Sequence, residues 1–146
     1  SVAALALLKL HKITEKSQYR KCAESILLLF TNRMEKAGSA VPYLLQALDF
    51  YLHEPYRVVV AGNPEDEAFQ KTLHALHNQY QPNRVLIGNH GPVEEFAKKQ
   101  TPEGNGSPLV YVCSGSACQI PTIDPKQFQS YLKAPPPQSQ NTTKED

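Results

Sequence analysis

Cys113 and Cys118 are the residues of this chain best suited to chemistry. The β-rich run Leu109 to Cys113 delivers one thiol into a short polar loop, and four residues separate it from the second thiol. A disulfide needs Cα atoms roughly 4.4–6.8 Å apart, and a loop that contains Gly115 can turn back far enough. The pair lacks the spacing and the helix-N-terminal placement that lower a thiol's pKa, and no Lys, Arg or His lies within the loop. Three hypotheses stay open: buried structural thiols, a reversible redox disulfide, or metal ligands.

Other candidates are weaker. His74 and His77 share one face of an expected helix, and His90 lies in a later loop, but no acidic partner completes a metal site. The turn at 62–64 stands where α/β proteins hold phosphates, yet it has one glycine and is followed by acids, so we expect a structural helix cap. No catalytic triad or carboxylate pair stands out. We therefore expect no metal, no cofactor and no complete catalytic site.

Composition narrows the class of protein. The 146 residues carry a net charge of +1 with 40% hydrophobic and 20% charged residues, which is typical of one soluble domain or two small units. The sequence has no basic stripe of the kind that predicts nucleic-acid binding. It also has no apolar run that reaches the ~18 residues of a membrane span. Three cysteines do not form a disulfide framework, so we expect Cys22 to be buried and the protein to be cytoplasmic. An apolar start without an initiator Met indicates a piece of a longer protein.

Residues 1–54 have the three-and-four spacing of helices. Ser17 is a candidate cap for a helix that continues past Tyr19 to Met34. This helix should end at Gly38-Ser39, and Pro42 suits the first position of the next. Its expected apolar stripe consists of Cys22, Ala23, Ile26, Leu27, Phe30 and Met34.

The period changes after residue 55. Strands are predicted at 57–62, 84–88 and 109–113, separated by a helix that starts near Asn63, a short helix within 92–99 and a loop at 100–108. A closing helix at 125–132 should be capped by Asp124. This alternation predicts an α/β unit over 56–133 with a small, mostly parallel three-stranded sheet and flanking helices. Residues 134–146 have the composition of a disordered tail.

Several segments together resemble a known family. They are Ser1-Val2-Ala3-Ala4, Ala40-Val41-Pro42, Val58-Val59-Val60-Ala61-Gly62, Tyr80 to Leu86, Tyr111-Val112-Cys113, Ala117-Cys118 and Asp124-Pro125. The chain resembles the C-terminal part of the thioredoxin domain-containing proteins related to spermatogenesis-associated protein 20 and bacterial YyaL. The resemblance implies a longer parent with a thioredoxin-like domain and an α/α toroid similar to six-hairpin glycosidases. Residues 1–54 would be the last toroid helices and 56–133 a C-terminal α/β appendage, so the expected partner is the rest of the parent chain.

Three functions follow as expectations. The first is a non-catalytic structural or accessory module of that parent. The second is part of an enzyme with thiol–disulfide redox or carbohydrate-processing activity, to which Cys113 and Cys118 contribute. The third is an interaction surface at the 100–108 loop. The sequence identifies no small-molecule or carbohydrate ligand.

Overall fold

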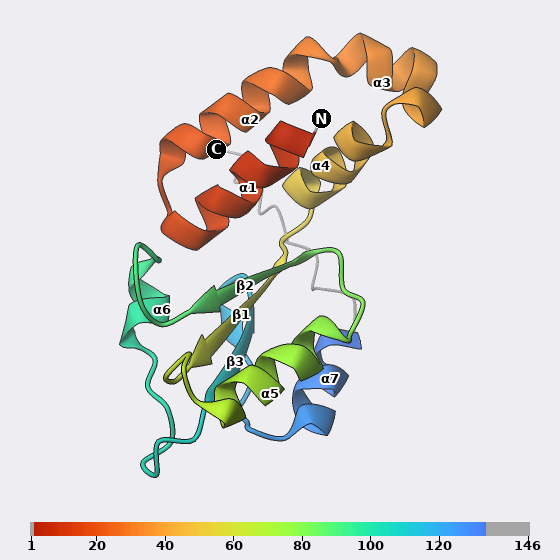
Figure 1. Cartoon of the computed structure of the whole chain (residues 1–146). Helices are drawn as coiled ribbons and strands as arrows, with labels where there is room; N and C mark the ends of the chain where they lie inside the picture. Colours follow the sequence, from red (N-terminus) through yellow and green to blue (C-terminus); the bar gives the residue numbers. More distant parts are fainter. Residues whose placement is uncertain (1, 134–146) are drawn as a thin grey trace, which may run out of the picture.

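The computed structural model describes residues 2–133, in which a β-sheet lies between two groups of helices (Figure 1). The predicted tail at 134–146 lies outside the described residues. The elements in chain order are α1 (Val2–Thr14), α2 (Ser17–Leu29), α3 (Thr31–Ala37), a 3-10 turn η1 (Gly38–Ala40), α4 (Pro42–Leu52), β1 (Tyr56–Ala61), α5 (Glu67–His77), β2 (Arg84–Gly88), α6 (Glu95–Lys99), β3 (Leu109–Ser114), β4 (Ala117–Cys118) and α7 (Pro125–Lys133).

The α/β class is confirmed, and the three predicted strands share one sheet, but the predicted pairing is wrong. The sheet has four strands in the order β2-β1-β3-β4. β1 pairs parallel with β2 and antiparallel with β3, and β3 pairs antiparallel with β4. The sheet of the described residues is therefore mixed, with a single parallel pairing.

The chain between β2 and β3 does not return along the sheet before β3 begins. β2 ends with Gly88 opposite Val60, and β3 begins with Leu109 opposite Ala61. The end of β2 and the start of β3 therefore both lie beside the carboxyl end of β1. A parallel β3 would require the chain to return along the full strand length, roughly 20 Å for six residues. α6 has five residues, about 7.5 Å of helix, and Asn89 Nδ2 holds the connection closed by donating to the carbonyl of Gln100 at 3.1 Å. The chain therefore enters β3 beside the carboxyl end of β1, and β3 runs antiparallel to β1.

One face of the sheet continues into the core of the helices. α1 packs against both α2 and α4 and also reaches β2. The buried side chains of this shared core are Ala4, Leu8, Ala23, Leu27, Leu44, Ala47, Phe50, Val59, Val85, Ile87 and Ala97. A second core, against α5 and α7, contains Tyr56, Val58, Val60, Phe69, Leu76, Val110, Val112, Phe128 and Leu132. The division into domains at residue 55 stays a prediction, and apolar packing crosses that boundary.

Two details of the helices differ from prediction. Ser17 is the first helical residue rather than the cap, and the cap residue Lys16 makes no side-chain capping bond. The expected continuous helix is interrupted at Phe30. Thr31 Oγ1 donates to the carbonyls of Leu27 and Leu28 at 3.2 and 3.0 Å, a local bond of the kind that bends helices.

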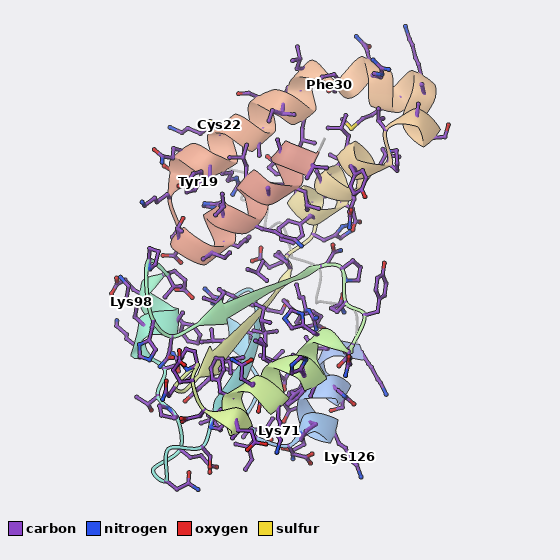
Figure 2. All side chains as sticks on the ribbon, viewed as in Figure 1. Tyr19, Cys22, Phe30, Lys71, Lys98 and Lys126 are labelled. Atoms are coloured by element: carbon purple, nitrogen blue, oxygen red, sulfur yellow. A yellow bond between two sulfur atoms is a disulfide. The ribbon has the colours of Figure 1, made fainter. Side chains whose placement is uncertain are left out.

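Cys22 is exposed, so its predicted burial is wrong. The helix stripe is centred on Ala23 and Leu27, which are 0% and 5% exposed, and Cys22 lies at its margin. Figure 2 shows Cys22 on the outer side of α2. Its neighbours on the stripe face α1, whereas the thiol does not.

Glu94 joins the helices, the sheet and α6. Its side chain is 1% exposed, Oε1 lies 3.4 Å from Arg57 Nη1 of β1, and Oε2 accepts from the Phe96 amide at 2.8 Å. The Glu94 amide donates to the carbonyl of Ile13 in α1 at 2.8 Å. The Arg57 guanidinium also lies 4.9 Å from the centre of the Phe96 ring. A buried carboxylate is tolerated because these groups partner it.

Glu94→Ala should lower the free energy of unfolding by about 2–4 kcal/mol, because it removes the α6 cap and leaves Arg57 without its carboxylate. Urea denaturation followed by circular dichroism measures the change. Glu95→Ala is the matched control, because Glu95 is exposed and pairs with Lys98 on the surface. The urea midpoint of this variant should stay close to that of the wild type. Equal losses for the two variants would contradict the role of Glu94.

Candidate functional site

A disulfide hairpin brings the two predicted cysteines together. β3 and β4 are joined by Gly115-Ser116, and Gly115 has a φ of 57°, as the first position of a type II′ turn requires. Cys113 and Cys118 face each other directly, and their sulfurs are bonded at 2.05 Å. The next pair is closed by the Gln119 amide, which donates to the carbonyl of Val112 at 2.8 Å. The cysteines thus occupy a non-hydrogen-bonded position, where Cα atoms approach most closely, here 4.0 Å.

The two sulfurs differ in accessibility. Cys113 is 1% exposed within the sheet, whereas Cys118 is exposed on the edge strand β4. Beyond β4 the chain continues along β3 and pairs Thr122 with Val110, one residue out of register with the cysteine pair. Pro121 lies in this irregular stretch and has no N–H to pair. A thiol from solution therefore meets Cys118 first.

Arg57 is a site residue that sequence reasoning missed. It is paired in register with Cys113 across β1 and β3, so their Cβ atoms lie on one face roughly 5 Å apart. The guanidinium itself points to Glu94. The loop between the cysteines contains no cation, and the antiparallel register that brings Arg57 opposite Cys113 is not visible in the sequence pattern. Arg57 is therefore a candidate to favour the thiolate form of Cys113 when the disulfide opens.

The hairpin tip borders a cavity of about 490 Å³ at the junction of helices and sheet. Its lining residues are His11, Lys12, Glu15, Glu54, Pro55, Tyr56, Arg57, Val85 and Gly115. Lys12 Nζ lies 2.8 Å from Glu54 Oε1, and burial raises the pKa of Tyr56. Glu15, the residue after α1, has a φ of 57°, a conformation that non-glycine residues rarely adopt. The lining contains side chains of both charges.

The other candidates from the sequence, the three histidines and the 62–64 turn, do not form a site in the described residues. His74, His77 and His90 are all exposed, and within residues 2–133 no three metal-ligating side chains come together. The 62–64 turn is structural, because Asn63 Oδ1 accepts from the Glu65 amide at 3.2 Å and Gly62 donates to Asn89 Oδ1 at 3.3 Å. None of the helices in the described range is long and apolar enough to cross a membrane.

Comparison with known proteins tests the resemblance. Spermatogenesis-associated protein 20 of Rattus norvegicus and of Homo sapiens are each 28% identical to this chain over 138 residues, which is 90% of the chain and 18% of each relative. These similarities support membership of the chain in the spermatogenesis-associated protein 20 family. An uncharacterized protein of Caenorhabditis elegans is 27% identical over 126 residues, 83% of the chain and 17% of that protein. No family model and no solved structure matches.

The predicted resemblance to the spermatogenesis-associated protein 20 family is therefore confirmed, and the chain spans about a fifth of the length of these relatives, 18% of the mammalian ones. It is similar to part of a larger protein. Of the three cysteines of this chain, the structure pairs Cys113 with Cys118 and leaves Cys22 free.

Cys118→Ser should lower the free energy of unfolding by about 2 kcal/mol through loss of the short cross-link. Cys113→Ser should lower it by a further ~1–2 kcal/mol, because it also places a hydroxyl at a buried position. Denaturation with and without a phosphine reductant measures both. The reductant should weaken the wild type to the level of Cys118→Ser and leave that variant unchanged. A wild type insensitive to reductant would argue against the disulfide.

Proposed function

We propose that this chain is a structural module that completes a larger protein of the spermatogenesis-associated protein 20 family. In this proposal residues 1–54 are the last helices of an α/α toroid, and 56–133 form a C-terminal α/β unit that packs under them. The thioredoxin-like domain and most of any carbohydrate-binding cavity would lie elsewhere in the parent, which we place in the cytoplasm. The match covers 18% of the length of the rat and human relatives, which supports the proposal that this chain corresponds to one part of a larger protein.

The observation that carries this proposal is an uncovered apolar surface on the helices. Leu28 and Leu29 at the end of α2 are 75% and 77% exposed. Beside them lies a groove of about 370 Å³, which we call the α2–α4 groove, lined by Glu24, Leu27, Leu28, Thr31, Met34, Leu48 and Tyr51. Contiguous apolar surface of this kind marks an interface in soluble proteins. The preceding helices of the parent chain would cover it.

One end of the groove is polar. Tyr51 donates to Glu24 Oε1 at 2.9 Å, and Arg20 Nε donates to the same oxygen. The hydrogen bond from Arg20, and then the one from Tyr51, lower the pKa of Glu24. An apolar centre with a polar rim is the usual anatomy of a protein interface.

The double change Leu28→Lys and Leu29→Lys should suppress concentration-dependent association of the chain. The isolated module exposes the surface that the parent would cover, so copies should associate through it. Analytical ultracentrifugation over a hundredfold concentration range, at fixed salt, measures the effect. The melting temperature should stay close to that of the wild type, because both side chains are already exposed.

Gln18→Lys is the matched control, since it adds a positive charge at an exposed position of the same helix. It should leave association unchanged. A wild-type chain that remains monomeric across the whole range, or association that survives the double change, would count against an interface at this surface.

A second candidate function, thiol–disulfide exchange, is favoured by the exposed Cys118 sulfur. Disulfides of cytosolic proteins are usually transient and catalytic or redox-sensing. The proposed step is attack of a small-molecule thiolate such as glutathione on Cys118 Sγ. A new bond forms to Cys118, the Cys113–Cys118 bond breaks, and Cys113 leaves as a thiolate on the face that it shares with Arg57.

Mass spectrometry of the chain after equilibration in glutathione buffers tests this step. Cys113→Ser should accumulate a mixed disulfide on Cys118, whereas the wild type should cycle between dithiol and disulfide without accumulating the adduct. Arg57→Gln should slow the opening of the wild-type disulfide. Alkylation of both thiols in the untreated oxidised protein would rule the redox function out.

A further inference from the structure

β2 forms an open edge of the sheet. It pairs with β1 on one side and with no other strand of the described chain. The Tyr56 amide donates to the carbonyl of Asn83 at 2.8 Å, so the backbone of Asn83 faces β1. Because backbone groups alternate along a strand, Arg84, Leu86 and Gly88 direct their N–H and C=O groups away from the sheet. Within residues 2–133 these outward groups have no hydrogen-bond partner.

A groove runs beside this edge. It has a volume of about 460 Å³ and lies between Lys9 and Ile13 of α1 on one side, the 79–82 turn on the other, and Arg84 to Leu86 of β2 at its base. Tyr80 in that turn is 89% exposed. An extended chain lying in the groove would therefore contact both an apolar ring and the unpaired strand backbone.

Two basic side chains border the groove. Lys9 and Arg84 line it, and no carboxylate of the described residues does. Neither Lys9 nor Arg84 forms an ion pair with a carboxylate of the described residues. The nearest acid along α4, Asp49, accepts from Asn83 Nδ2 at 2.7 Å and is also paired with His53.

A hydrogen bond to α5 anchors the side chain of Arg84. Its Nη1 donates to the carbonyl of Leu76 at 2.7 Å, and burial lowers the pKa of the guanidinium. A cation that is partly withdrawn from water interacts more strongly with an incoming anion. The groove thus combines two features of peptide-binding edges, which are unpaired backbone and side-chain selectivity.

We propose that the β2 edge binds an extended acidic peptide segment by strand addition. The added strand pairs with the outward backbone groups of Leu86 and Gly88, its carboxylates lie near Lys9 and Arg84, and an apolar residue rests on Tyr80. This surface is separate from the α2–α4 groove and does not depend on the disulfide. It is an interaction site for a partner chain, in addition to the interface proposed for the rest of the parent.

The test uses the whole 146-residue chain and a capped heptapeptide of alternating Glu and Val, with a Lys–Val peptide as the matched control probe. Two-dimensional NMR should show perturbations at the amides of Arg84, Leu86 and Gly88, and fluorescence anisotropy should give saturable binding. The affinity should fall about tenfold or more between low salt and 0.5 M salt. Absence of binding at millimolar peptide, or equal binding of the Lys–Val peptide, would overturn the proposal.

Leu86→Pro and Leu86→Ala separate the backbone from the side chain. Both shorten the side chain, but only proline removes the outward N–H without touching the β1–β2 ladder. Binding should be lost in Leu86→Pro and retained in Leu86→Ala. Lys9→Gln should weaken binding about threefold to tenfold and reduce its salt dependence.

If Leu86→Pro does not fold, the NMR map on the wild type decides alone, and perturbations confined to other surfaces overturn the proposal. A second copy of the chain is the competing occupant of the edge. A wild-type dimer in ultracentrifugation that excludes the peptide would assign the edge to self-association and also overturn the proposal.

Discussion

The packing of the helices onto the sheet around one buried carboxylate determines the arrangement of the whole chain. Glu94 is shielded from water and accepts from Arg57 and the Phe96 amide, while its own amide reaches the end of α1. A charge in that position is stable only with such partners. The surrounding apolar cluster continues from α1, α2 and α4 to β1 and β2. The cavity beside the hairpin tip and the groove beside β2 are both lined by residues of α1, and both therefore lie where α1 meets the sheet.

The two edges of the sheet are protected in different ways. At one edge the two-residue strand β4 is fixed by the Cys113–Cys118 disulfide and followed by Pro121, so few backbone groups are left to pair. At the other edge no strand of residues 2–133 covers β2, β2 contains no proline, and the groove lined by Lys9 and Arg84 runs beside it. We relate the first edge to redox sensitivity and the second to partner binding. Only the β4 edge contains residues, Cys113 and Cys118, that the sequence predicts as candidates for chemistry.

Sequence patterns predicted elements far better than their pairing. The β-branched run at Val58 to Val60 and the Asp124 cap, whose Oδ1 accepts from the Lys126 amide at 2.9 Å, follow from local properties and were predicted. The direction of β3 depends on the path of the chain between β2 and β3, which periodicity does not encode. Arg57 opposite Cys113 was missed for the same reason. Cys22 was misplaced because residues at the margin of an apolar stripe depend on how the helix is rotated against its neighbour.

Hydrogen exchange of native amides at increasing denaturant tests most directly whether helices and sheet are one cooperative unit. The shared core predicts that the slowest amides of α1, α4, β1 and β2 exchange through the same opening, with one free energy and one denaturant dependence. Amides of α1 and α4 that exchange at a clearly lower free energy than those of β1 would contradict it, because the helices would then unfold while the sheet stays intact.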